Sequence, residues 1–557
     1  MEAEVILNLT FNKYNYEYIS RFAHASHDDV PLDVVQVHLA RFCQTIALLK
    51  SQYTKSCIQS GVLPFIAQIL REHQNDLIIG CAAITLTHLS LYTNQKSLNN
   101  SQDSQQFFNA KIIIVKANLL SPLLHICVWN TNPNVLCEII KLIASLAKNL
   151  SNKRAIASKQ GVKILVDFLK IRIDENHVQQ SAITVPVLVM IFTALVNLTH
   201  GKKEIPVWYI IKLILFRIGS EIIQTQIVSL GGLPLIIEIL NTISDMTTCT
   251  QGARLLANLA HKHFLNQGTI ITYEGNVALV NQLKREDACG ELKEACFWCF
   301  CNLAHHGNSQ DAIGYSDAVP LIVHSLVQDT CPRILAAASA ACASLCYSNM
   351  VNKHRFAQEH GAEALLLILS SPERYNNDND VLSFACRALS SYLQADGSVR
   401  FITQLEGVFS LVQLCANAVD SQVIRCSGMV VASLSPTEGE RYDLESEGRP
   451  VLVTQYGGIS VLERVRHSGY TQEGIPVPFW LEETLRVLSA SSQELHQRPE
   501  SDWLGVVGNV SESRLTVRAE FYERGVLAHQ FFTCIVPDET CSDFFCETET
   551  VVETLSE

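Results

Sequence analysis

The apolar positions of the chain recur with a period in the low forties. A loop residue precedes an apolar helix at Gly231, Gly275, Asp317 and Gly361, at intervals of 44, 42 and 44 residues. Each of these apolar helices is followed by a polar loop and then by a second helix, such as 253–260. Internal repeats of this length, with two or three helices each, indicate an α-solenoid. Such a chain presents a long surface, so we expect binding rather than catalysis.

The same pattern extends to both sides of this central stretch. Related segments begin at Gly61, Leu119, Gly161, Gly407 and Gly457. The long interval between the first two indicates an insertion, for which the polar stretch 94–106 is the natural place. Glycine adopts positive φ without steric cost. We therefore expect the glycines at these starting points to form tight turns between helices.

One stretch interrupts the period. From Asn197 to Gly231 there are 34 positions, about twice the matching interval from Asn258 to Gly275. Removal of Gly201–Gly219 restores the spacing. Two interpretations stay open. The segment is either foreign to the repeat, as an isoform insertion or a translated intron, or a genuine extra helix that covers an exposed groove.

Composition narrows the classes of partner. Hydrophobic residues make up 48% of the 557 residues and charged residues 17%, which favours an ordered chain. The formal net charge of −13 argues against a general nucleic-acid or acidic-membrane binder. We therefore expect protein partners, including ones with a basic segment, no nucleic acid, and no insertion into a membrane.

Cysteine usage and apolar runs indicate the compartment. Nineteen cysteines are spread through a long helical pattern instead of marking a small secreted framework, which fits a reducing compartment. The longest apolar runs, Val185–Leu198 and Ile205–Ile218, are short for a membrane span and contain prolines. We expect no signal peptide, because no basic region precedes an apolar core at the N-terminus. The sequence predicts a soluble protein of the cytoplasm, with the nucleus as a second location.

The second long helix of each unit ends in an apolar segment with one recurrent polar residue. This residue is asparagine three times and His or Ser elsewhere: Asn197, Asn258, Asn302, His88, Ser145, Ser344, Ser391 and Ser433. Together with the Gly-x-x-x-Leu-x-x-x-Leu segments, these helix ends make the chain, from about Val37 to Ala490, resemble the armadillo repeat superfamily. The resemblance implies three helices per repeat, a right-handed superhelix, and third helices that line a concave groove. It also implies that the three asparagines face this groove.

Asparagine in a groove has a clear chemical use. Its amide has a donor and an acceptor, so it can hold both the N–H and the C=O of an extended peptide. The alternative is that each Asn stabilises its helix end and the following loop. Trp298 lies four residues before Asn302, on the same helical face. The candidate groove residues are Asn197, Asn258, Trp298, Asn302, Arg254, Ser344 and Ser391.

Import receptors of this superfamily bind lysine-rich signals with repeated Trp-x-x-x-Asn arrays. Here Arg254 and Thr193 stand where further tryptophans are needed, so import-receptor activity is not expected. Trp298 alone is either a single hot spot or a core side chain.

Metal and catalytic signatures are weak. Cys296, Cys299 and Cys301 lie near His305 and His306, but one helix does not direct all three thiols to one point, as zinc requires. The chain has no Gly-x-Gly-x-x-Gly, Walker loop, Gly-x-Ser-x-Gly or His-Glu-x-x-His motif. We expect no metal, no cofactor and no catalytic residues.

The sequence therefore predicts an all-α chain, a right-handed α-solenoid of armadillo repeats with a less regular C-terminal tail. The expected divisions are an N-terminal extension 1–36, a repeat array 37–490 that contains the 201–219 segment, and an irregular, acidic, partly flexible tail 491–557. The expected function is a non-catalytic scaffold that binds a partner segment in the groove. The alternative is a substrate-recognition adaptor of a cullin-type ubiquitin ligase, because some armadillo proteins carry a cullin-recruiting BTB domain.

Overall fold

The computed structural model describes residues 58, 62–72, 74–91, 109–175, 184–200, 221–393, 407–434, 453, 456–472 and 474–496. Expectations for 1–36, for 94–106, for Gly201–Gly219 and for the tail from 497 onward lie outside these ranges. The described elements are helical, and no strand occurs among them. The chain divides into two compact units, Met1–Asn258 and Leu259–Glu557.

The helices of unit 1 are α5 (Val62–Glu72), α6 (Asp76–Ser90), α7 (Ala110–Lys116), α8 (Leu120–Trp129), α9 (Pro133–Ala147), α10 (Leu150–Ser158), α11 (Gly161–Glu175), α12 (Thr184–Thr199), Glu221–Ser229, α14 (Gly232–Thr242) and α15 (Met246–Ala260).

The helices of unit 2 are α16 (Phe264–Thr272), α17 (Gly275–Leu283), α18 (Gly290–Leu303), α19 (Gly307–Gly314), α20 (Ala318–Gln328), α21 (Pro332–Cys346), α22 (Met350–Gln358), α23 (Gly361–Ser370), the 3₁₀ turn η2 (Pro372–Tyr375), α24 (Asn379–Leu393), α26 (Gly407–Asn417), α27 (Ser421–Ser433), α29 (Gly458–Arg464), the π-helical η4 (Val465–Thr471) and α30 (Phe479–His496).

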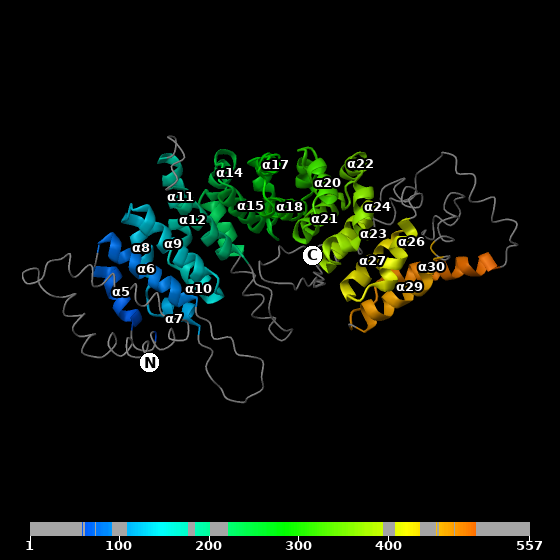
Figure 1. Ribbon diagram of the computed structural model, residues 1–557, viewed down its shortest axis with the longest axis horizontal. Coiled ribbons are helices and arrows are strands. Elements are labelled where there is room, and N and C mark those ends of the chain that lie inside the picture. The colour runs from blue at the N-terminus through cyan, green and yellow to red at the C-terminus, as the bar shows by residue number, and fades with distance from the viewer. Residues whose placement is uncertain are drawn as a thin grey trace, which may run out of the picture. The chain divides into compact units, whose positions relative to one another are not determined.

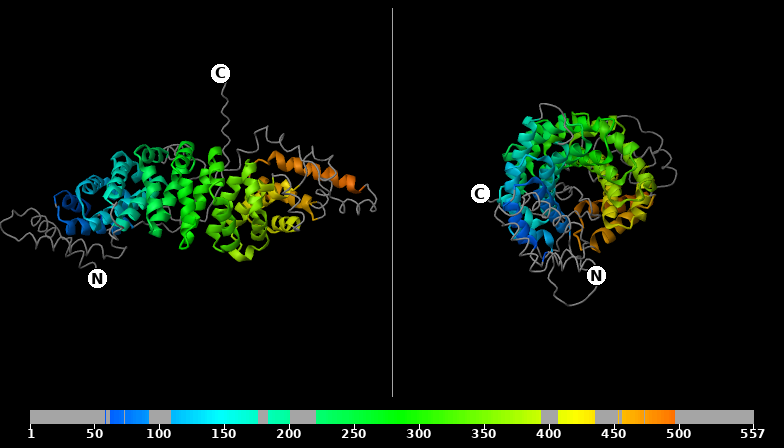
Figure 2. Two further views of the ribbon diagram at one scale, coloured as in Figure 1. Left: turned by 90° about the horizontal axis from the view of Figure 1, so that it is seen from above. Right: turned by 60° about the vertical axis from the view of Figure 1, so that its left-hand side comes forward.

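The helices form repeats of three, each with a first, a second and a third helix. Complete repeats in unit 1 are α7–α8–α9, α10–α11–α12 and Glu221–Ser229 with α14 and α15, the last two residues of which belong to unit 2. Complete repeats in unit 2 are α16–α17–α18, α19–α20–α21 and α22–α23–α24. Within a unit, the third helix of one repeat packs on the third helix of the next. In unit 1, α6 packs on α9 and α9 on α12; in unit 2, α18 packs on α21 and α21 on α24. These rows of helices can be followed by label in Figure 1 and by colour in Figure 2. The helical repeat predicted from the sequence is confirmed.

The period is more regular in the structure than in the sequence pattern. A residue in the left-handed backbone region ends each first helix, at Gly231, Glu274, Asp317 and His360, each 43 residues after the last. The glycine expectation therefore holds at Gly231, which has a φ of 79°. Three of the four positions carry a side chain despite their positive φ, so the packing of the repeat fixes the turn.

The same expectation is wrong for Gly161, Gly275 and Gly361, because these glycines begin the second helix instead of forming the turn. At Gly161 and Gly361 the reason for glycine is steric, because a side chain would collide with the preceding helix. A Cβ on Gly161 would lie 2.8 Å from the carbonyl oxygen of Ile156, and one on Gly361 2.9 Å from that of Phe356. Real Cβ atoms do not approach a backbone oxygen so closely, so these positions need a residue without a side chain.

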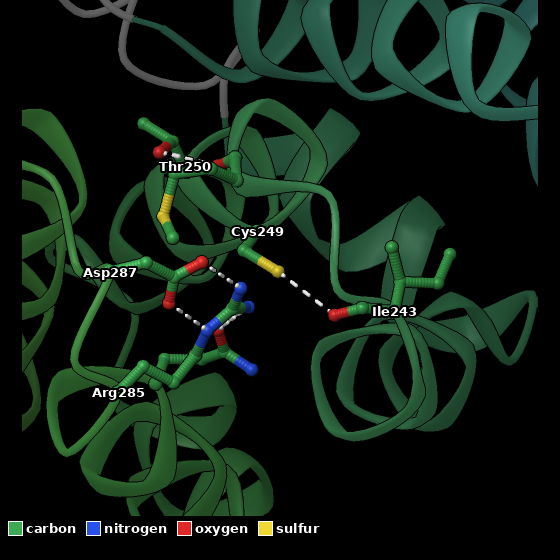
Figure 3. A network of polar contacts seen from close by, with 7 residues as sticks. Ile243, Cys249, Thr250, Arg285 and Asp287 are labelled. Atoms are coloured by element: carbon green, nitrogen blue, oxygen red, sulfur yellow. Dashed lines mark hydrogen bonds and ion pairs between the residues drawn. The ribbon is translucent and has the colours of Figure 1, made fainter. Parts of the chain in front are cut away.

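Short polar contacts fix the loops between second and third helices. In unit 2, the Arg285 guanidinium donates to both carboxylate oxygens of Asp287, at 2.9 and 2.8 Å (Figure 3). It also donates to Gln282 Oε1 at 3.0 Å. In unit 1, the Cys249 thiol donates to the carbonyl oxygen of Ile243 at 3.3 Å (Figure 3). Both contacts hold the loop that orients the following third helix.

Among the described helices none is long and apolar enough to cross a bilayer by itself. Two sharply bent pairs pass the length and composition test only when their members are joined, Ala110–Lys116 with Leu120–Trp129 and Glu221–Ser229 with Gly232–Thr242.

Candidate functional site

The candidate residues occupy one fixed position on the third helices. Each lies 13 residues after the residue that caps the helix, as in Asn132 to Ser145, Cys289 to Asn302 and Cys331 to Ser344. We call this position the ladder row; it comprises His88, Ser145, Asn197, Asn258, Asn302, Ser344, Ser391 and Ser433. The position four residues earlier, one turn away on the same face, is the companion row. It comprises Ile84, Lys141, Thr193, Arg254, Trp298, Ala340, Arg387 and Met429.

In unit 1 the ladder row links neighbouring third helices. The Asn197 amide donates to the Ala144 carbonyl oxygen at the end of α9, at 3.0 Å. Asn258 donates in the same way to the Val196 carbonyl oxygen and to Thr199 Oγ1 of α12, both at 3.3 Å. The amides therefore join one repeat to the previous one, a role that neither sequence interpretation anticipated.

Unit 2 has the same link with weaker groups. Ser344 Oγ lies 3.3 Å from the Cys301 sulfur, and Ser433 Oγ lies 3.2 Å from Ser390 Oγ. The ladder residue of one repeat thus meets the end of the preceding third helix, as it does in unit 1. Ser391 itself is 2% exposed, and its hydroxyl has no hydrogen-bond partner in the structure. Buried hydroxyls usually have one, so this group is unusual.

Trp298 is a buried side chain, only 1% exposed. Its ring meets the edge of Phe384 on α24, with ring centroids 5.5 Å apart. The contact spans α21, which carries only small residues at the corresponding places, among them Ala337, Ala340 and Ala341. Trp298 therefore packs across a whole repeat. Asn302, one turn further along α18, is fully buried.

The charged members of the companion row are basic. Lys141 is half exposed and lies 3.6 Å from Glu138, and Arg254 is partly exposed. Arg387 is largely buried, with its guanidinium 5.6 Å from the Phe384 ring centroid and its Nε donating to the Cys426 sulfur at 3.4 Å. No acidic residue occurs in either row of the described third helices. The charged residues of the two rows are therefore all basic, although Lys141 is paired with Glu138 and the chain as a whole is acidic.

A second polar row was missed at the sequence level. The fourth residue of the first helix donates to a carbonyl oxygen at the end of a third helix: Lys153 to His200, Gln224 to Asn258, Gln267 to Ala260 and Gln310 to Ser344. A cation or an amide at a helix C-terminus satisfies carbonyls that have no partner within the helix. The signal was present in the sequence, because Gln267, Gln310 and Lys353 are 43 residues apart.

The cysteine cluster is part of the core. Cys296, Cys299 and Cys301 are all buried in α18, and burial raises the pKa of the Cys299 thiol. Within the described part of the chain, no three metal-ligating side chains gather at one point. The fourteen cysteines described there are free thiols.

Comparisons with known proteins address the fold alone. No family model matches the sequence, and no curated protein does. Among solved structures, an engineered protein of the Northeast Structural Genomics Consortium aligns with this chain at a TM-score of 0.63 and 19% identity. The alignment includes 86% of this chain and 99% of the engineered protein.

Two further engineered proteins of the consortium are 21% and 18% identical to this chain. Their alignments include 47% and 46% of this chain, and 97% and 98% of the engineered proteins. Their TM-scores of 0.40 and 0.39 are too low to support an argument. Identities at this level show the fold and nothing of the function. The first likeness, together with the three-helix units, shows that the chain has a helical-repeat, solenoid-like fold.

Proposed function

We propose that the protein is a non-catalytic scaffold of the armadillo type, which binds an extended segment of a partner along the companion and ladder rows of α6, α9, α12 and α15, where every member but the buried Asn258 is exposed or partly exposed. The observation that carries this proposal is the fixed register of the two rows, which repeats one pair of positions on successive third helices. Such a repeated surface suits an extended chain, because each repeat contacts a few residues and the affinities add.

The local charge defines the partner more narrowly than the net charge does. The net charge of −13 favours a basic segment. The rows themselves carry Lys141, Arg254 and Arg387 and no acid among the described residues. Since contacts at the surface decide recognition, the segment we propose is neutral or acidic. The proposed location is the cytoplasm or nucleus, in keeping with free cysteines.

A paired charge reversal tests the proposal. Partners are captured from a cell lysate with the wild-type chain and with Lys141→Glu/Arg254→Glu, and are identified by mass spectrometry. The matched control is Lys163→Glu/Lys170→Glu, which changes the net charge equally at exposed positions of α11, a second helix. The proposal expects partners lost from the first variant and kept by the control. Equal recovery by both would sink it, and recovery of a cullin would favour the adaptor function instead.

A further inference from the structure

Helices α6, α9 and α12 of unit 1 are aligned along their length. They pack in succession (Figure 1). Near their N-terminal ends, Cys137 Sγ of α9 lies 3.9 Å from the carbonyl oxygen of Pro186 on α12. Near the C-terminal ends, Ser90 Oγ of α6 lies 2.7 Å from Ser145 Oγ of α9. Corresponding positions of the three helices therefore lie next to one another and form one face.

This face has two chemically different halves. The companion and ladder residues form the half nearer the C-terminal ends, and they are polar except for Ile84. The positions three and four residues before the companion row lie one turn closer to the N-terminal ends. Five of these six residues are apolar and partly exposed, and we call them the apolar strip: Gly80, Cys81, Cys137, Val189 and Met190. The sixth is Glu138, which lies 3.6 Å from Lys141.

The apolar strip has a notch at Gly80. This residue has no side chain where α9 and α12 each carry one, and Leu77 and Ile84 lie one turn to either side of it. A Cβ on Gly80 would meet only Val135 Cγ2, at the ordinary contact distance of 4.0 Å. Leu77 is 56% exposed, so the wall that it forms is open to solvent. A small space with such apolar walls suits an aliphatic side chain.

We propose that this face binds an extended segment in which aliphatic residues alternate with acidic ones, with one aliphatic side chain seated in the notch at Gly80. The inference rests on the proposed function and names the chemistry of its partner. Successive side chains of an extended chain point to opposite sides. A segment that crosses the helices therefore sends its aliphatic side chains to the apolar strip and its acidic ones to the companion and ladder rows. There the acids meet the ammonium group of Lys141, which is 51% exposed, and the exposed His88.

Two native thiols report whether the face is occupied. Cys81 and Cys137 are partly exposed, and the exposed Cys331 of unit 2 is the reference. Burial raises the pKa of the Cys81 and Cys137 thiols, so alkylation with iodoacetamide is run at about pH 9. The probe is a peptide of about ten residues in which leucine and glutamate alternate. At saturation it is expected to slow alkylation of both thiols about tenfold relative to Cys331, as measured by mass spectrometry.

Two control peptides test the pattern and the charge. One has the same composition with its leucines and glutamates in two separate blocks, and the other alternates leucine with lysine. The block peptide cannot place its apolar and acidic side chains on opposite sides, and the lysine peptide brings cations to Lys141. Neither is expected to protect the two thiols.

A substitution that fills the notch tests the position of the aliphatic side chain. Gly80→Leu is expected to weaken binding of the alternating peptide about tenfold, as measured by fluorescence anisotropy. Leucine favours a helix interior more than glycine does, so the variant should unfold at the same or a higher temperature. The matched control is Gly307→Leu, at a position of α19 where a Cβ meets nothing within 4 Å. It should leave the affinity unchanged.

Three results would overturn the inference: no protection of Cys81 and Cys137 at up to about 1 mM alternating peptide, equal protection by either control peptide, or unchanged affinity of the folded Gly80→Leu variant. The two proposals fail separately. If partner capture depends on Lys141 and Arg254 while the alternating peptide gives no protection, only the alternating pattern is lost.

Discussion

The two units use one repeat but expose its third helices differently. In unit 1 the companion and ladder rows are partly open, with His88 and Lys141 exposed and Asn197 partly exposed, although Asn258 is buried. In unit 2 the rows are buried from Trp298 to Ser391. Both units nevertheless link successive third helices at the ladder row. The ladder is therefore structural in both units, and access to the rows varies independently of it.

The largest expected effect compares the companion row of the two units. Trp298→Ala removes a buried ring that packs on Phe384, so we expect a loss of about 3–5 kcal/mol in the free energy of unfolding. Thr193→Ala at the matching position of α12 removes a partly exposed hydroxyl bonded to Val189 within its own helix, and should change stability by about 0.5 kcal/mol or less. Urea titration followed by circular dichroism measures both. Equal losses would show that the rows do not differ in burial.

A second pair compares the ladder row. Asn258→Ala leaves the Val196 carbonyl oxygen without the amide that donates to it, and should cost about 1–3 kcal/mol. Ser344→Ala loses a contact with a thiol, a weaker hydrogen-bonding group, and should cost less than about 1 kcal/mol. The same titration measures this pair. A greater loss for Ser344→Ala would reverse the order of the two links.

The third prediction makes unit 1 more like unit 2. Helix α12 ends at Thr199 and the next helix that the structure describes begins at Glu221, whereas α18 and α19 are joined through 304–306. Deletion of Gly201–Gly219 leaves Ser220 eleven residues before the left-handed Gly231, as His306 stands before Asp317. If the segment is foreign to the repeat, we expect equal or higher thermal stability, because each halving of the connection saves about 0.6 kcal/mol of closure entropy. Cooperative loss of helix would instead identify the segment as a packed element.

The smallest effect concerns the left-handed turn. His360 in unit 2 stands where unit 1 has Gln160, and the Glu363 carboxylate 2.8 Å away raises the pKa of His360 above 6.5. A raised pKa stabilises the fold below the pKa of the unfolded chain, and this is lost as pH rises through the folded-state value. His360→Gln should therefore lower the melting temperature slightly at pH 5.5 and leave it unchanged at pH 8.5. A decrease of the same size at both pH values would contradict a charged contact.

The sequence predicts the fold better than it predicts the roles of the site residues. The period, the helix pairs and the ladder positions could be predicted, because apolar periodicity and one recurrent polar residue are local signals. For Trp298 the sequence left a hot spot and a core side chain open, and it could not decide between them because the partner Phe384 lies two repeats away. The role of Asn258 was missed for a similar reason. Its acceptor, the Val196 carbonyl oxygen, is a backbone group that no pattern of side chains reveals.

The ladder bonds join only successive third helices, which has a mechanical consequence. A chain held by such bonds, when pulled from its ends, should extend one repeat at a time, each step releasing about 43 residues, or about 150 Å of contour. The ring contact between Trp298 and Phe384 bypasses one repeat. The three repeats that contain α18, α21 and α24 should therefore resist the force together and yield in a single longer step.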